Sequence, residues 1–432
     1  MTLLTPFPAA MHESAFALAY GLLLLSPLAI AGVALMNAGL GRSRSAAQAL
    51  LGDLILVAVS ILVFALIGGG LLGFSSGAGL SFHAAGKPWN WLGFGPFLLR
   101  GLGAASPRDQ LALLFEFPAV ALAGIIPWGS GADRCRLLAG AAVAALLAIF
   151  VFPLVAHWTW AGGWLAQLDV TFTLGADFLD PGGAASVHVL GGLSALALVW
   201  IVGPRKGKFP KEGLSTAIPG HNAAYVLFGC LVSLVGWLAW NAAGALIWLH
   251  APLSSLPSTA MGTLLCASGS LAATFAVTRL RFGKPDASLC ANGWLAGLVA
   301  SSACAAIVTP GQAIFVGVVI GIVTPLQVEL FELALSIDDP SGAITVHAVS
   351  GFWGLLAAGI FAPRPGQLLA QLIGIAALGG VILPLVYFLL ALLNLLLHFR
   401  VEADGERIGM DLHELGGGAY PEFVVHRDES YR

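Results

Sequence analysis

Long apolar runs follow one another along the chain, separated by short polar segments. A helix that crosses a bilayer needs about 20 apolar residues. Eleven runs meet that length: Ser14 to Gly39, Ala46 to Phe74, Leu111 to Gly129, Leu137 to His157, Ala185 to Val202, Ala223 to Leu249, Ala260 to Val277, Leu289 to Val308, Ala313 to Leu335, Ala343 to Ala362, and Leu368 to Leu397. The pattern predicts an all-α integral membrane protein with eleven transmembrane helices. The first run lacks a preceding basic segment and is too long for a signal peptide, so we expect it to remain as a span.

The composition agrees with a membrane protein. Of 432 residues, 58% are hydrophobic and only 9% are charged, whereas soluble domains carry about 25% charged residues. The net charge of -3 gives no indication of a nucleic-acid partner. The five cysteines are scattered without a metal-ligand spacing, and no nucleophile elbow or phosphate loop is present. We therefore expect neither an enzyme nor a protein with a metal or a cofactor.

The basic residues predict how the chain lies in the membrane. Of its 19 lysines and arginines, 15 fall in alternate loops and the C-terminal tail, and only Lys87, Arg100, Arg108 and Arg364 fall on the other side. Positive charge collects on the cytoplasmic side of membrane proteins. The count predicts an outside N-terminus and a cytoplasmic C-terminus in the cell's inner, or plasma, membrane.

One motif occurs twice. "DPGGAASVHVLGG" begins at Asp180 and "DPSGAITVHAVSG" at Asp339, and seven of their thirteen positions are identical. In each copy the aspartate is expected at the N-cap of a helix and the proline at its first position. The copies open spans five and ten, which run in opposite directions. The chain is therefore predicted to contain a five-plus-five inverted repeat, an arrangement that places a site near the membrane midplane.

The two histidines of this motif are expected to meet. His188 and His347 each follow their aspartate by eight residues, which is about 12 Å along a helix. In a core about 30 Å thick, their depths then differ by only about 6 Å. A single buried histidine is commonly a core residue that bonds a carbonyl, but a pair at matched depth favours a proton relay or a site that holds a neutral substrate. Metal binding is disfavoured, because no carboxylate or cysteine shares the pattern.

With these motifs the chain resembles the Amt/Mep/Rh ammonium transporter family, specifically its Amt branch. The resemblance rests on the two histidine motifs, on "HNAAYVLFGCLVSLVGWLAWNAAG" from His221, on "DDPSGAITVHAVSGFWGLLAAGIFA" from Asp338 and on "GMDLHELGGGAYPEF" from Gly409. It implies a homotrimer in which each subunit holds a narrow hydrophobic pore. It would make His188 and His347 the pore pair.

The resemblance also places an outer ammonium recruitment site. Trp160 in "AHWTWAGG" falls on the tryptophan of that site, and Asp180 falls on the aspartate below it. Phe115 matches an aromatic residue near the vestibule. The recruitment serine falls on Gly244, which removes a hydroxyl acceptor.

Two stacked phenylalanines normally gate the pore of this family. With Asp133 and Arg134 aligned on the family's acidic-arginine pair, the first gate position falls on Ala119. The second falls on Trp240. We expect a rearranged gate in which one ring is lost and the other is enlarged.

Together these observations predict an ammonium transporter or channel. It would recruit NH4+ outside and conduct NH3, with or without a relayed proton, through a transport domain over residues 1–398. The cytoplasmic tail over 399–432 resembles tails that contact a PII-type regulatory protein. Two alternatives stay open: an Rh-like electroneutral channel for NH3 or CO2, and a non-conducting ammonium sensor.

Overall fold

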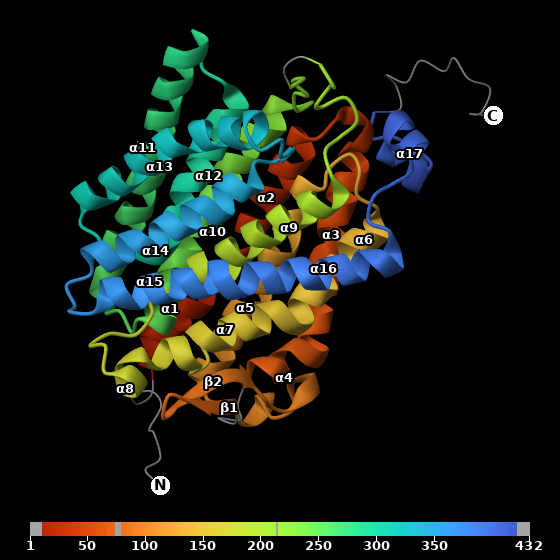
Figure 1. The fold of residues 1–432 in the computed structure, drawn as a ribbon. Helices are drawn as coiled ribbons and strands as arrows, with labels where there is room; N and C mark the ends of the chain where they lie inside the picture. The colour runs from red at the N-terminus through yellow and green to blue at the C-terminus, as the bar shows by residue number, and fades with distance from the viewer. Residues whose placement is uncertain (1–10, 74–78, 213–214, 421–432) are drawn as a thin grey trace.

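The computed structural model describes residues 11–73, 79–212 and 215–420. Long helices dominate these residues, as Figure 1 shows. The described part contains eleven helical stretches that are long and apolar enough to cross a membrane, as the sequence predicted: Glu13–Leu40, Ser43–Leu72, Pro107–Ser130, Leu137–Phe172, Ala184–Val202, Ala223–Trp248, Leu253–Phe282, Ala287–Cys304, Pro310–Leu333, Ile344–Phe361 and Gln367–Leu397. Phe74, the expected end of the second span, lies outside the described residues.

The first five spans combine α-helices with short π-helical or 3-10 segments. In chain order their elements are α1 (Glu13–Leu23), α2 (Pro27–Leu40), η1 (Ser43–Ser45), α3 (Ala46–Val63), η2 (Phe64–Gly68), α4 (Gly69–Leu72), α5 (Pro107–Ser130), α6 (Leu137–Leu146), η5 (Leu147–Val151), α7 (Phe152–Thr159), η6 (Trp164–Gln167), α8 (Leu168–Phe172), η7 (Ala184–Val189) and α9 (Leu190–Val202).

Spans six to eleven and the tail also combine α-helices with short π-helical or 3-10 segments. Their elements are α10 (Ala223–Trp248), η8 (Leu253–Ser255), α11 (Leu256–Phe282), α12 (Ala287–Cys304), α13 (Pro310–Leu333), η9 (Ile344–Val349), α14 (Ser350–Phe361), α15 (Gln367–Ala377), η10 (Leu378–Ile382), α16 (Leu383–Leu397), α17 (Ala403–Ile408) and η11 (Asp411–Leu415).

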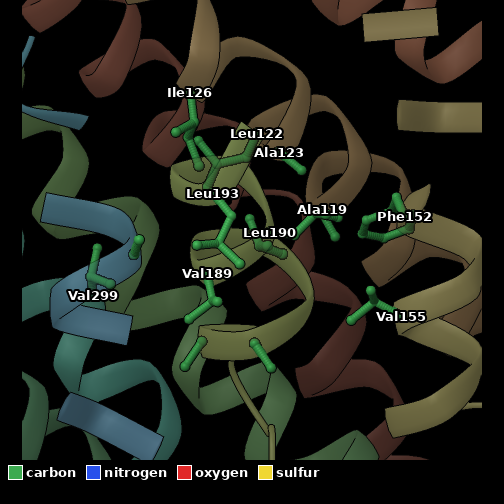
Figure 2. Packing of buried hydrophobic residues seen from close by; sticks show 14 of the residues in the cluster. Ala119, Leu122, Ala123, Ile126, Phe152, Val155, Val189, Leu190, Leu193 and Val299 are labelled. Atoms are coloured by element: carbon green, nitrogen blue, oxygen red, sulfur yellow. The ribbon is translucent and has the colours of Figure 1, made fainter. Parts of the chain in front are cut away.

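The packing of the helices repeats between the two halves of the chain. Helix α5 packs against α9 as α12 packs against α14, and α3 packs against α6 as α11 packs against α13. Each partner lies five spans from its counterpart. Figure 2 shows the apolar core where α5, α7 and α9 come together around Ala119, Phe152 and Leu190.

Small residues bring the two halves into direct backbone contact. Helices α2 and α10 cross where Gly32 faces Gly229 and Ser233, and a Cβ on Gly32 would lie 2.6 Å from the Gly229 carbonyl oxygen. Transmembrane helices associate through such close approaches, because lipid tails provide no hydrophobic driving force between them. At this crossing, close packing of the two helices explains why the chain has glycines.

A β-hairpin lies between the second and third spans, where no strand was predicted. Strand β1 (Gly79–Ala84) pairs antiparallel with β2 (Lys87–Gly93), and Phe82 stands opposite Trp89. The two rings stack with centroids 6.1 Å apart. Such cross-strand aromatic pairs stabilise a hairpin, whereas the span-length pattern of apolar runs carries no signal for it.

The described part of the tail packs on the end of the bundle where α3 and α6 begin. Asp411 accepts hydrogen bonds from the backbone N–H groups of Ala47 (3.1 Å) and Gln48 (2.7 Å). Glu414 accepts from the N–H of Leu137 at 2.9 Å. These carboxylates therefore satisfy N-terminal donors of two transmembrane helices.

Candidate functional site

The two histidine motifs fold into matching π-helical segments, η7 and η9. Before each segment a glycine takes a left-handed conformation, with φ of 77° at Gly183 and 69° at Gly342. Gly183 and Gly342 then accept the backbone N–H groups of residues 187 and 346, each at 2.9 Å. Glycine adopts positive φ without a steric penalty, which explains why both copies keep it at this position.

The expected position of the Asp-Pro pairs at the helix starts was wrong. Pro181 lies in a turn ahead of η7, and the segment itself begins at Ala184 with Gly183 as its N-cap. Asp180 still binds the first turn, because its Oδ1 accepts the N–H of Ala185 and its Oδ2 the N–H of Ser186, both at 2.9 Å. The left-handed glycine folds the turn back, so the aspartate caps the segment from several residues upstream.

Asp339 occupies the same position in the second copy. Its Oδ2 accepts the N–H of Ile344 at 2.8 Å, and its Oδ1 accepts the hydroxyl of Ser130 at 2.7 Å. Burial raises the pKa of both Asp180 and Asp339, against the opposing effect of the hydrogen bonds that each carboxylate accepts. Both aspartates thus bind the backbone of their own motif, although neither is the N-cap residue.

His188 and His347 are in contact at the junction of the two motifs. Their Nδ1 atoms are 3.3 Å apart, and the rings are nearly parallel with centroids separated by 5.3 Å. Both side chains are buried. The proximity expected from the repeat is present, although each histidine lies near the start of its helix rather than two turns inside it.

A tryptophan that sequence reasoning did not single out supports this pair. Trp237 stacks on His188 with a centroid distance of 5.2 Å and an interplanar angle of 13°. Its indole N–H donates to the hydroxyl of Ser302 at 3.0 Å. Trp237 lies one helical turn before Trp240 in the "GWLAWNAAG" motif, so its spacing along α10 was the available signal.

Four aromatic rings form a cluster beyond the histidines, on the expected outer side. Phe115 contacts Trp160 (centroids 5.4 Å apart), Trp240 (4.6 Å) and Trp248 (5.8 Å). Trp248 also stacks on Trp160 at 5.2 Å with an interplanar angle of only 7°. The structure thus brings together Phe115, Trp160 and Trp240, and adds Trp248, which sequence reasoning missed.

The turn before η7 holds two of these rings. Trp160 donates its indole N–H to the Asp180 carbonyl at 2.7 Å, and Trp240 donates to the Gly182 carbonyl at 3.0 Å. Both indoles are therefore fixed in orientation as well as packed. Asp180 thus serves the site through two different groups, its carboxylate on the helix and its carbonyl on Trp160.

Gly244 and Ala119, the two small residues at the expected recruitment and gate positions, have different surroundings. A Cβ on Gly244 would overlap the carbonyl oxygen of Pro181, so the turn occupies the space that a side chain would need. Ala119 is fully buried one helical turn after Phe115 on α5. Figure 2 draws Ala119 in the apolar core near Phe152 and Val155. The absent serine hydroxyl therefore leaves no open space at Gly244.

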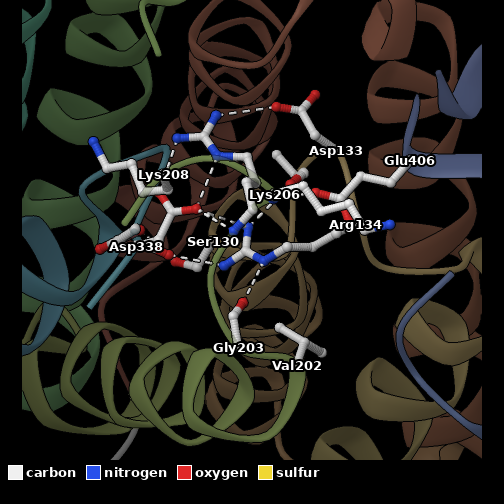
Figure 3. Close-up of polar contacts among 12 residues, drawn as sticks. Ser130, Asp133, Arg134, Val202, Gly203, Lys206, Lys208, Asp338 and Glu406 are labelled. Carbon is white, nitrogen blue, oxygen red and sulfur yellow. Dashed lines mark hydrogen bonds and ion pairs between the residues drawn. The ribbon is translucent and has the colours of Figure 1, made fainter. Parts of the chain in front are cut away.

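A buried ion-pair cluster lies at the other end of the bundle (Figure 3). Arg205 binds Asp133 at 3.0 Å and Asp338 at 2.9 Å, and Arg134 donates to the Asp338 and Gly203 carbonyls. Burial alone would raise the pKa of Asp338, but its hydrogen bonds to Arg205 and the charges of Arg134 and Arg205 outweigh burial and lower it. The Asp133–Arg134 pair is thus part of a structural cluster.

Metal ligands do not gather in the part of the chain that the structure describes. Its histidine, cysteine and carboxylate side chains form no group of three that could hold an ion. All five cysteines are buried and free, and burial raises the pKa of the Cys135 thiol to about 12. A thiol of that pKa is a poor nucleophile and a poor metal ligand.

Comparison with known proteins gives a consistent result. A model of the Ammonium Transporter Family matches residues 15–420. The ammonium transporter Amt2 of Archaeoglobus fulgidus is 31% identical over 420 residues, covering 92% of this chain and 86% of that protein. Amt2 of Haloferax mediterranei is 32% identical, covering 91% of this chain and 87% of that protein.

Solved structures agree in fold. The structure titled "Sensor Amt Protein" aligns with a TM-score of 0.83 at 25% identity, covering 93% of this chain and 98% of that chain. Mep2 of Candida albicans aligns with a TM-score of 0.79 at 23% identity, covering 96% and 91% respectively. The Mep2 likeness concerns the fold alone.

Proposed function

Because the chain belongs to the ammonium transporter family, we propose that it recruits NH4+ at the aromatic cluster and conducts NH3 past His188 and His347. The chain is a multi-pass membrane protein, and we place the aromatic cluster on the outside, following the distribution of its basic residues. The proposed product of each passage is ammonia on the cytoplasmic side, with or without a separately relayed proton.

The cost of moving charge explains why the proton would leave before the pore. Transfer of an ammonium-sized ion into a low-dielectric core costs of order 20 kcal/mol in the Born limit. With a pKa near the 10.4 of a lysine ammonium, deprotonation at pH 7 costs only about 4.6 kcal/mol. A metal cation has no proton to release, so this difference alone would favour ammonium over Na+ or K+.

The contact between the two imidazoles is the observation that carries the proposal. A bond between two Nδ1 atoms needs one N–H and one lone pair, so the rings take opposite neutral tautomers. The pair then has one Nε2 that accepts and one Nε2–H that donates. Ammonia can both donate and accept a hydrogen bond, so it suits this pair, and exchange of the two tautomers would relay a proton.

The aromatic cluster would act before that step. A cation over the face of Trp160 gains about 0.5–2 kcal/mol, and the Asp180 carbonyl fixes the orientation of that ring by accepting its indole N–H. We propose that Phe115 and Trp240 form the barrier between this site and the histidines. Ala119 and Gly244 contribute no ring or hydroxyl, which leaves recruitment to the aromatic faces.

Two other candidates rest on specific features. A non-conducting ammonium sensor is favoured by the closed packing of the four rings, and one structural neighbour is itself titled a sensor. An Rh-like electroneutral channel for NH3 or CO2 is favoured by the lack of a side chain at Gly244. The homotrimer and a PII-type partner for the tail are further proposals that rest on the family resemblance.

Transport is tested by the ammonium-induced current of purified protein in proteoliposomes. The test variant combines His188→Ala with His347→Ala, and the exposed His83→Ala serves as the histidine control. We expect a saturable current in wild type and control that the double variant loses. Ammonia flux without current would favour the electroneutral channel, and the absence of both would favour the sensor. Unchanged current in the double variant would remove the histidines from the mechanism.

A further inference from the structure

Trp248 covers the ring to which the cation is proposed to bind. Its indole lies parallel to Trp160 with centroids 5.2 Å apart, and Phe115 meets it edge-on. Trp160 is only 4% exposed as a result of its packing, whereas Trp248 itself is partly exposed. A cation cannot occupy the face of Trp160 that another ring already covers. This arrangement therefore closes the outer site from the side on which Trp248 lies.

The indole N–H groups distinguish Trp248 from the other two tryptophans of the cluster. Trp160 and Trp240 donate to the carbonyls of Asp180 and Gly182. The Nε1 atom of Trp248 is buried and has no hydrogen-bond partner among the described residues. A buried donor without an acceptor is unfavourable. Stacking alone thus favours the closed position, and rotation of the ring toward water would satisfy its N–H.

The backbone around Trp248 is held in place. Trp248 is the last residue of α10, and the carbonyl of Ile247 accepts a hydrogen bond from Arg108 at 2.7 Å. Arg108 also contacts Nε2 of His250 at 2.8 Å, and His250 has a left-handed φ of 52°. Because Ile247 before Trp248 and His250 two residues after it both contact Arg108 of α5, its movement would be a change of rotamer and not an unwinding of the helix.

We propose that Trp248 is a movable lid over the outer ammonium site. In the closed state its ring occupies the face of Trp160. In the open state the ring has turned out and an ammonium ion takes its place. This inference rests on the proposed function, because it assumes that Trp160 receives the cation. The lid replaces part of the barrier that is missing at Ala119. It lies farther out than Ala119, so the cation meets the lid before it binds.

A lid that competes with the ligand weakens apparent affinity, because only the open fraction can bind. Removal of the ring should therefore tighten binding. From the strength of an aromatic pair we expect the half-saturating ammonium concentration to fall about two- to tenfold in Trp248→Ala. Trp160→Ala should instead raise this concentration, and Trp200→Ala, which removes an exposed indole elsewhere, should leave it unchanged. A rise in Trp248→Ala would make Trp248 a wall of the site and overturn the lid.

A second measurement follows the ring directly. Protein labelled with 5-fluorotryptophan would be studied by 19F NMR in detergent, and the Trp248 resonance assigned by its absence in Trp248→Phe. We expect ammonium to shift this resonance and to increase its H2O/D2O solvent-isotope effect, because the ring turns toward water. The same titration with NaCl at equal ionic strength is the control.

The two measurements separate the lid from the transport function. One outcome would overturn the lid and leave transport standing. In that outcome wild type carries current, ammonium leaves the Trp248 resonance unchanged, and Trp248→Ala has an unaltered half-saturating concentration. A Trp248 response without any ammonium current or flux would overturn transport and leave the lid on a sensor. Neither current nor response would overturn both.

Discussion

The turn formed by residues 180–183 positions most of the proposed outer site. The carbonyls of Asp180 and Gly182 bind the indoles of Trp160 and Trp240, and the Asp180 carboxylate binds the start of η7. Between them, the Pro181 carbonyl packs directly on Gly244. A small change in this turn would therefore move both tryptophans and the segment that carries His188.

The first residue-scale prediction concerns Gly244→Ser. The new Cβ would displace the Pro181 carbonyl, so we expect a loss of about 1–3 kcal/mol from overpacking. Gly379→Ser is the matched control, since a Cβ at Gly379 meets nothing within 4 Å outside the adjacent backbone of its own helix. Thermal unfolding in detergent measures the difference. A variant as stable as wild type that also binds ammonium more tightly would contradict the packing argument.

At the scale of the helical elements, η7 and η9 share a backbone but differ in polar contacts. Ser186, two residues before His188, donates its hydroxyl to Asp180 at 2.7 Å and lies 2.8 Å from the hydroxyl of Thr159. Thr345 occupies the equivalent position before His347. Its buried hydroxyl has no partner among the described residues. The same repeat position is therefore satisfied in one copy and unsatisfied in the other.

This asymmetry predicts opposite effects of removing the two hydroxyls. Ser186→Ala should cost about 1–2 kcal/mol, because it removes a buried hydrogen bond to a carboxylate. Thr345→Val keeps the shape of the side chain and should be neutral or stabilising, since it removes an unpaired polar atom. Thermal unfolding of both variants in one detergent provides the comparison. Equal losses would show that the repeat positions are energetically equivalent.

At the scale of the whole molecule, the buried ion pairs join the two halves of the chain. Asp133 belongs to the first half and Asp338 to the second, and Arg205 in the loop between them binds both. Leaving a buried charge without its partner costs about 3–5 kcal/mol. Asp338→Asn should therefore strongly destabilise the protein at neutral pH.

The same pair predicts a dependence on pH. The folded pKa of Asp338 is lowered from its ordinary value of 3.8. Its contribution to stability is therefore present above about pH 4 and is lost as the pH falls through the folded pKa. The difference in melting temperature between wild type and Asp338→Asn should shrink below pH 4. Asp180 and Asp339 have raised pKa values and act with the opposite sign, but both residues are present in wild type and variant. A difference in melting temperature that stays constant across this range would therefore contradict the assignment to Asp338.

The tail gives a separate prediction at this scale. Asp411 caps α3 and Glu414 caps α6, and loss of an N-cap carboxylate costs about 0.5–2 kcal/mol. We expect Asp411→Asn combined with Glu414→Gln to lower the melting temperature and to expose the tail to limited proteolysis. Glu402→Gln is the control, because its side chain is 79% exposed in its ion pair with Arg136. Equal protection of the tail in all three proteins would contradict the capping role.

The sequence by itself determined the eleven spans, the inverted repeat and the meeting of His188 with His347. These follow from local properties, since the length of an apolar run and the spacing within a repeated motif do not depend on distant residues. Family membership followed from the same motifs. The exact helix starts did not, because the left-handed Gly183 and Gly342 fold each turn back in a way that capping preferences do not encode.

Only the tertiary structure decided what covers each site residue. Trp248 lies 88 residues from Trp160 in the chain and stacks on it because the end of α10 meets the end of α7. From the sequence alone, Gly244 is notable for the missing serine hydroxyl. In the fold, the backbone of Pro181 fills the space that a side chain would need. The hydrogen bonds of the tail likewise join residues far apart in sequence. Such contacts depend on the relative placement of whole helices, which is set by the packing of both halves together.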